Sequence, residues 1–169
     1  MRCLDIGARE YRLDGFETLD IDPNIKGLDY VLDASQPLPF EDNSFDIVHA
    51  SHIIEHISYT KIEQVLKEWI RILRPGGVLE IWTPNLLRIA QRFLNTETGN
   101  PAEWKRDPCE AFCVFIYPPG HVSAYTERYL RQILKKLGIK NIRRMTEEED
   151  RHAKPPSYVW RNLGIRGIK

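Results

Sequence analysis

The sequence predicts an α/β domain built on a doubly wound, mostly parallel β-sheet. Short apolar runs alternate with amphipathic segments of helical period, and most of these runs are too apolar for a strand with one solvated face. The chain has 169 residues, of which 42% are hydrophobic and 28% charged, enough for one domain with its own core. We therefore expect a single domain over residues 1–169.

The predicted strands are short apolar runs bounded by turn residues. They cover residues 2–6, 17–21, 30–32, 45–50 and 78–83, with a late strand over 139–144. A helix is predicted over about 60–73, where apolar residues recur at helical spacing before Arg-Pro-Gly-Gly ends it. A second helix is predicted from about Thr126 to a stop at Gly138.

Two segments lack a clear period. Residues 95–120 have a polar half and an aromatic half, and we expect an irregular insertion there that acts as a lid or binding segment. Residues 146–169 form a C-terminal extension that begins acidic and ends basic. For this extension we predict a final edge strand around Tyr158, followed by a frayed tail.

The charge balance excludes a strong overall attraction to nucleic acid or to an anionic membrane. Lys plus Arg equals Asp plus Glu at 24 each. No run has the length of a membrane span, and the first residues, MRCLDIGARE, lack the apolar run of a signal peptide. The three cysteines are too few for a disulfide framework, so we expect a cytoplasmic protein.

The first two predicted strands end in acidic residues. Asp5 and Gly7 belong to LDIGARE, and Asp20 belongs to LDIDP. Glycine after the first strand lets the backbone approach a ligand, and a carboxylate at the tip of the second can accept from both hydroxyls of a ribose. The alternatives are a plain turn at Gly7 and a turn or cap role for the aspartates, which suits Asp22 better than Asp20.

The third strand end, LDASQPLPF, could recognise adenine without phosphates. Asp33 can accept a hydrogen bond from the adenine amino group, the Ala34 amide can donate to the ring, and Leu38 or Phe40 can pack on its face. An ordinary core role for Leu38 and Phe40 is equally open.

Three longer segments share a pattern with one enzyme family. The run DASQPLPFEDNSFDIVHASHIIEHI, then RILRPGGVLEIWTPN, and later HVSAYTERYLRQILKKLGI resemble class I S-adenosylmethionine-dependent methyltransferases, especially the compact branch that modifies small molecules. The resemblance implies a Rossmann-like methyltransferase fold and S-adenosylmethionine as cofactor. By position it implies these contacts: Asp5 and Gly7 with the methionine part, Asp20 with ribose, Asp33 and Ala34 with adenine, and Ala50, Ser51 and His52 with the sulfonium region.

The chain departs from the family after its first strand. Only GARE follows that strand, and Asp20 comes thirteen positions after Gly7, where a dinucleotide-binding domain has about twenty. A crossover helix needs a dozen or more residues, so we expect the first helix to be missing or reduced to a turn. This counts against a dinucleotide, because no helix N-terminus is available for a pyrophosphate, and it counts less against a phosphate-free cofactor.

Methyl transfer to a hydroxyl benefits from a base near neutral pKa, which histidine provides. His121, after a Pro-Pro-Gly turn, is the first candidate, and His56, in the family-like EHI stretch, is the second. A purely structural role is equally open for both. His49, His52 and His56 do not have the spacing of a metal site, so we expect no metal.

The expected acceptor is a small molecule or a sugar-containing metabolite, because aromatic residues at Phe112, Phe115 and Tyr117 could wall a pocket. Two other functions stay open. One is a catalytically silent binding or interaction domain, favoured by the short first loop. The other, less favoured, is a nucleic-acid methyltransferase using the basic and aromatic C-terminus.

Overall fold

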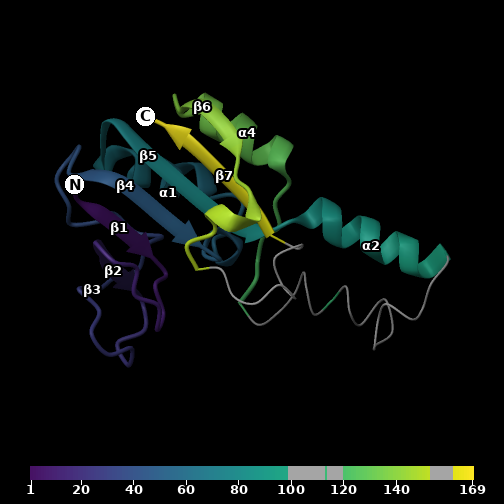
Figure 1. Ribbon diagram of the computed structural model, residues 1–169, viewed down its shortest axis with the longest axis horizontal. Helices are drawn as coiled ribbons and strands as arrows, with labels where there is room; N and C mark the ends of the chain where they lie inside the picture. The colour runs from purple at the N-terminus through teal and green to yellow at the C-terminus, as the bar shows by residue number, and fades with distance from the viewer. Residues whose placement is uncertain (99–112, 114–119, 153–161) are drawn as a thin grey trace.

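The computed structural model describes residues 1–98, 113, 120–152 and 162–169. Seven strands form one sheet in the order β3-β2-β1-β4-β5-β7-β6 (Figure 1). The strands from β1 to β5 pair in parallel, and β7 runs antiparallel to both β5 and β6. The predicted α/β class with a doubly wound, mostly parallel sheet is confirmed.

The sheet contains the six predicted strands and one further strand, β7. The bounds of the six differ from the prediction by one residue or two, except at β5. The strands are β1 (Cys3–Ile6), β2 (Phe16–Asp20), β3 (Tyr30–Val31), β4 (Phe45–Ser51), β5 (Leu73–Pro84), β6 (Lys140–Arg144) and β7 (Asn162–Ile168). β5 begins five residues before the predicted start at residue 78, because the Arg-Pro-Gly-Gly segment is already extended. Strand β7 was not predicted at this place.

In the described parts of the chain, α-helices and short 3-10 helices accompany the sheet. They are η1 (Ile54–His56), α1 (Ile62–Ile72), α2 (Leu86–Thr98), α4 (Glu127–Lys136) and η3 (Glu147–Glu149). α1 and α4 match the two predicted helices, and the Thr126 hydroxyl caps α4 by accepting from the Tyr129 amide. α2 was not predicted. Because it continues to Thr98, the expectation of irregular chain from residue 95 was wrong for residues 95–98.

One face of the sheet carries the hydrophobic core. Alternate residues of β1, β4 and β5, such as Leu4, Val48 and Leu79, lie in register and are almost fully buried with the apolar sides of α1 and α4. Lys136 of α4 forms an ion pair of 2.6 Å with Glu63 of α1, so both helices cover this same face. Side chains alternate across a strand, and the residues between these core positions point to the other face.

The connection from β1 to β2 contains only turns, and the predicted loss of the first crossover helix is confirmed. Gly7 has a positive φ of 76°, and its amide donates to the Leu19 carbonyl at 2.7 Å. Glycine adopts this backbone conformation without strain, which allows the chain to turn immediately after β1. The connection reaches β2 within nine residues, 7–15, so this crossover places no helix on the sheet.

The face opposite the core carries a row of polar side chains. Asp5, His49 and Glu80 occupy one register line across β1, β4 and β5, and all three are buried. The helices α1 and α4 lie on the opposite face of the sheet and do not cover this row (Figure 1). The chain around Arg151 and His152 covers it instead, with Arg151 donating to both Glu80 oxygens at 2.7 and 3.2 Å. This segment thus takes the place of a helix.

The expected C-terminal edge strand was wrong in its position. β7 is an interior strand between β5 and β6 and begins at Asn162, whereas Tyr158 lies outside the described residues. Gly164 and Gly167 weaken the strand signal in the sequence, because glycine is depleted in strands. In the structure, Gly164 faces the Trp82 indole on the neighbouring strand, where a Cβ atom would lie 2.5 to 2.7 Å from ring carbons. The glycine therefore makes room for the tryptophan.

The described residues include no helix that combines the length and the apolar character needed to cross a membrane.

We predict that Gly164→Ala destabilises the protein by about 1–3 kcal/mol, because overpacking against a rigid indole forces the strand or the ring to move. The measurement is chemical denaturation. In a Trp82→Leu background the same substitution should cost clearly less, since the ring carbons that it meets are gone. Equal costs in both backgrounds would contradict the proposed contact.

A second prediction concerns acid stability. Burial by itself raises the pKa of Glu80, but His49 and Arg151 beside the carboxylate lower it to about 2, from an ordinary value of 4.5. The folded state then binds fewer protons than the unfolded state, so the stability that Glu80 contributes is present above about pH 5 and is lost toward pH 2. Its size is roughly 2–3 kcal/mol.

The free energy of unfolding of wild type should therefore fall more steeply between about pH 5 and pH 2 than that of Glu80→Gln. Glu41→Gln, at an exposed position, serves as the matched control and should follow wild type. Parallel curves for wild type and Glu80→Gln would contradict this assignment.

Candidate active site

Asp20 ends β2 at the carboxyl edge of the sheet. It is 9% exposed, its Oδ2 accepts from the Arg9 amide at 3.0 Å, and its Oδ1 accepts from the Asp22 amide at 3.1 Å. The two bonds fix the carboxylate and leave further acceptor positions, since an ionised carboxylate offers about four. Asp20 is therefore oriented and can still accept from a pair of hydroxyls.

Ile21, directly after Asp20, has an exposed side chain of 64% relative area, although it is large and apolar. The sequence reasoning did not single it out. An apolar surface next to a fixed carboxylate suits a ligand that combines a flat ring with hydroxyls, as a nucleoside does. The signal available in the sequence was the apolar residue between two acids in Asp20-Ile21-Asp22.

Asp33 follows β3, the neighbour of β2 in the sheet. Burial by itself raises the pKa of Asp33, but hydrogen bonds from Ser35, including its amide at 2.8 Å, bring the pKa below its ordinary value. The Ala34 carbonyl accepts from the Trp69 indole at 3.0 Å, which fixes this loop to α1. Leu38 is buried in the core cluster, which agrees with the ordinary core role that the sequence left open as the alternative to adenine contact. Contact of these residues with adenine stays a prediction.

The residues predicted to contact the methionine part of the cofactor are less accessible than Asp20 and Ile21. The side chain of Ile53 occupies the space into which a Cβ atom at Gly7 would point. Asp5 has no exposed surface, and its Oδ2 lies 2.9 Å from His152 Nε2. Asp20 and Asp33 thus lie at the edge of the sheet, whereas the Asp5 carboxylate is held on the sheet face beneath His152.

Ser51 and His52 follow at the end of β4. Ser51 is 6% exposed and pairs with Trp82 in the sheet. His52 has a left-handed backbone with φ of 56°, uncommon for a residue other than glycine, and its amide donates to the Trp82 carbonyl at 2.9 Å. This bend turns the chain away from the sheet and directs the His52 ring toward Glu55.

Glu55 is the centre of a histidine cluster that the sequence reasoning missed. It is 1% exposed, its Oε1 lies 3.0 Å from His52 Nδ1, and its Oε2 accepts from the Thr83 hydroxyl at 3.1 Å. His121 Nε2 lies 4.0 Å from Oε1. The clue in the sequence was a glutamate inside the apolar run Ile53-Ile54-Glu55, because a buried carboxylate needs polar partners.

His121 and His56, the two predicted bases, lie side by side. Their rings meet edge to face with centroids 4.7 Å apart, and His56 Nδ1 lies 3.0 Å from the Gly120 carbonyl oxygen. Burial lowers the pKa of His121 below 6.5, against the opposing effect of Glu55. A neutral imidazole with a carboxylate behind it is suited to accept a proton. His121 has this environment, and a catalytic role for either histidine stays a prediction.

The residues at this edge fit S-adenosylmethionine in part. Asp20 has free acceptor positions beside the exposed Ile21, which suits the adenosine half of the cofactor. Ile53 covers Gly7 and must turn aside before the methionine half can approach that backbone. We therefore predict that the adenosine half can bind here without rearrangement and that the methionine half requires the Ile53 side chain to move.

Comparisons with known proteins agree with these observations. Residues 5–81 match the family model described as a methyltransferase domain. The chain is 48% identical over 59 residues to phthiotriol/phenolphthiotriol dimycocerosates methyltransferase 1 of Mycobacterium ulcerans, covering 33% of this chain and 20% of that protein. It is 35% identical over 74 residues to the mitochondrial 2-methoxy-6-polyprenyl-1,4-benzoquinol methylase of Bos taurus, covering 44% and 19%. The chain thus spans about a fifth of the length of these relatives.

Solved structures share the fold over almost the whole chain. A SAM-dependent methyltransferase from Archaeoglobus fulgidus superposes with a TM-score of 0.64 at 16% identity, covering 99% of this chain and 86% of that one. Phosphoethanolamine N-methyltransferase 2 of Haemonchus contortus, in complex with S-adenosyl-L-methionine, gives 0.62 at 19% identity, covering 99% and 48%. Residues 5–81 therefore match a methyltransferase domain in sequence, and the chain shares its fold with S-adenosylmethionine-dependent methyltransferases of known structure.

Proposed function

We propose that this chain transfers the methyl group of S-adenosylmethionine to a hydroxyl of a lipophilic small molecule at the carboxyl edge of its sheet. The observation that carries the proposal is the pairing of two features at that edge. A fixed carboxylate with spare acceptor positions, Asp20, ends β2, and a histidine backed by a buried glutamate, His121 with Glu55, lies beyond the end of β4.

Asp20 would hold the ribose hydroxyls, and Ile21 with the Asp33 loop would border the adenine. Gly7, Ser51 and His52 would line the methionine end once Ile53 turns aside, with Asp5 supporting the Gly7 turn from beneath. The bound cofactor supplies the activated methyl group, so the chain's main task is alignment and exclusion of water. Alignment of reacting groups is worth roughly 7–11 kcal/mol.

His121 would take the proton of the acceptor hydroxyl as the hydroxyl oxygen forms its bond to the methyl group. Glu55 is a positioning residue in this scheme, since its carboxylate faces His121 and His52 from within the protein. His56 packs against the His121 ring and limits its rotation. The proton thus moves from the acceptor oxygen to an imidazole nitrogen.

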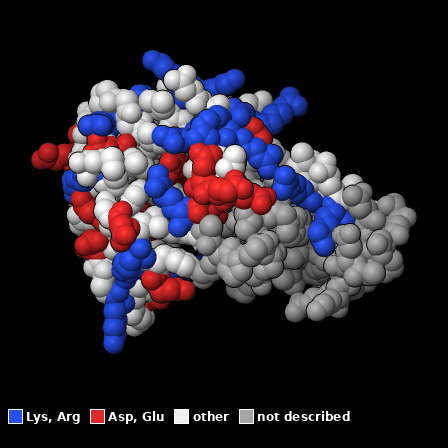
Figure 2. Space-filling view, viewed as in Figure 1, with Lys and Arg blue, Asp and Glu red and all other residues white. Residues whose placement is uncertain are grey.

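The acceptor class is inferred from the surface near His121 and from the relatives. Val122, next to His121, is 59% exposed, which favours an acceptor with apolar parts. The names of the relatives specify a triol and a quinol, both hydroxyl-bearing, as substrates of those proteins. On the face in Figure 2, acidic and basic side chains adjoin one another over the described residues, a pattern that does not favour a nucleic-acid acceptor.

A catalytically silent domain is the second candidate, and Ile53 is the observation that favours it. In a silent domain this side chain would stay on Gly7 and the cofactor would not bind. Calorimetry with S-adenosylmethionine decides between the two, because only the proposed enzyme requires binding.

We predict that Asp20→Asn weakens S-adenosylmethionine binding by about 10-fold to 100-fold, because hydrogen bonds to a charged group contribute about 1.5–3 kcal/mol. Isothermal calorimetry measures the effect. Asp22→Asn is the matched control, since the same chemical change two residues away, on an exposed side chain, should leave the affinity unchanged. Equal losses in both variants would argue against ribose recognition by Asp20.

We further predict that His121→Gln lowers kcat by about 10²-fold to 10⁴-fold while cofactor affinity is retained, the loss expected for removal of a general base. The assay follows S-adenosylhomocysteine formation with a panel of hydroxylated lipids and quinols. His56→Gln should have a smaller effect. The reverse ranking would assign the base to His56.

The pH profile tests the role of Glu55. Glu55 raises the pKa of His121 against the larger effect of burial. Glu55→Gln removes that effect, so the pKa of His121 should fall and the acid limb of the kcat/KM profile should move to lower pH. A limb that stays in place, or moves to higher pH, would show that Glu55 does not act through His121.

A further inference from the structure

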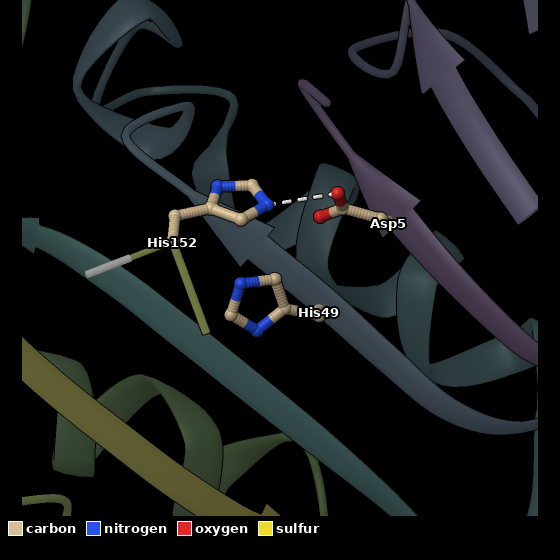
Figure 3. Close-up of side chains that lie close together, drawn as sticks. All are labelled: Asp5, His49 and His152. Atoms are coloured by element: carbon tan, nitrogen blue, oxygen red, sulfur yellow. Dashed lines mark hydrogen bonds and ion pairs between the residues drawn. The ribbon is translucent and has the colours of Figure 1, made fainter. Parts of the chain in front are cut away.

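Three side chains from distant parts of the chain meet on the sheet face opposite α1 and α4. Asp5 comes from β1, His49 from β4 and His152 from the segment after η3 (Figure 3). One potential ligand atom from each lies within 4.8 Å of the other two. This cluster, which we call the sheet-face cluster, is separate from Glu55, His56 and His121.

The sheet-face cluster contains buried polar atoms without hydrogen-bond partners among the described residues. These atoms are Asp5 Oδ1 and both ring nitrogens of His49. Asp5 and His49 have no exposed surface, and the His152 side chain is 8% exposed. Buried polar atoms are nearly always bonded, so these unpaired atoms indicate a missing partner.

The cluster also has the outer contacts of a metal site. His49 Nδ1 faces Glu80 Oε2 at 3.4 Å without forming a hydrogen bond, and Nε2 lies on the other side of the ring. Arg151 holds Glu80 in place at 2.7 Å. Histidine ligands of metals characteristically donate their second nitrogen to a carboxylate, which fixes the tautomer and the ring orientation. Tyr11 stacks on the His152 ring with centroids 4.9 Å apart and orients it.

The dimensions suit a small divalent cation. Zinc binds histidine nitrogen and carboxylate oxygen at about 2.0–2.2 Å, so tetrahedral ligand atoms lie roughly 3.3 Å apart. His152 Nε2 and Asp5 Oδ2 are 2.9 Å apart, and the remaining separations need to shrink by at most about 1.5 Å from the 4.8 Å limit. We expect rotation of the two imidazole rings to bring the ligand atoms to these distances. Two histidines and one aspartate leave a fourth position for water.

We propose that Asp5, His49 and His152 form a zinc site that fastens the segment around His152 to the sheet. The site does not depend on the proposed methyl transfer. A bound cation compensates the buried Asp5 carboxylate and gives the orphaned nitrogen of His49 a partner. The segment that replaces the missing helix is then attached by two links, the Arg151–Glu80 ion pair and the zinc ion.

The test is zinc binding by the full chain after treatment with a chelator. Wild type should bind one zinc ion per chain, its melting temperature should rise with zinc concentration, and cobalt substitution should give the intense visible absorption of a four-coordinate site. His152→Ala and Asp5→Asn should each weaken zinc binding by at least about 100-fold, and Glu80→Gln by about 10-fold to 100-fold.

The double variant His56→Ala/His121→Ala is the matched control, because it removes two histidines from the other cluster and should retain the zinc ion. Loss of zinc in this control, with retention in His152→Ala, would overturn the proposal. Absence of stoichiometric zinc from wild type would overturn it as well. His152 lies outside the sheet, so His152→Ala keeps the test valid if Asp5→Asn, within β1, fails to fold, and circular dichroism verifies the fold of each variant.

Discussion

The short connection between β1 and β2 is the constraint on which the rest of this structure depends. Residues 7–15 turn back through Gly7 and form no helix, so one face of a mostly parallel sheet has no helix from this crossover to cover it. Parallel sheets are normally buried on both faces. Here Asp5, His49 and Glu80 make that face polar, and the chain around Arg151 and His152 covers it through charge and hydrogen bonds.

The same constraint separates the carboxyl edge of the sheet from the polar sheet face. With no helix after β1, the Asp5 carboxylate is engaged by His152, while Asp20 and Asp33 remain at the edge where the parallel strands end. Ligands of open α/β sheets bind at this edge. The two predicted bases belong to a third place, the turn after β4, where Glu55 gathers His52 and His121. Three groups of titratable residues thus occupy separate positions on one small sheet.

The sequence predicted the parallel strands and the two amphipathic helices well, because periodicity of apolar residues is a local property. It predicted Asp20 and Asp33 at strand ends for the same reason. It did not reveal that Glu55 is buried among histidines, or that Asp5, His49 and His152 converge, because these contacts join residues far apart in sequence. β7 was misplaced because Gly164 and Gly167 weaken a strand signal, while their purpose, room for Trp82 and Ile139, is visible only in three dimensions.

The position of β7 has a consequence for the order of folding. Among the described strands, β6 pairs only with β7, and β7 joins it to β5. During synthesis β6 therefore emerges before the strand that anchors it, and α4, which packs against β6 and β7, has to wait as well. Such pairings of distant segments form slowly. The part of α4 that packs against β6 and β7 consequently lacks these partners in their final arrangement until residues 162–168 have left the ribosome, a period in which a nascent chain is prone to aggregate.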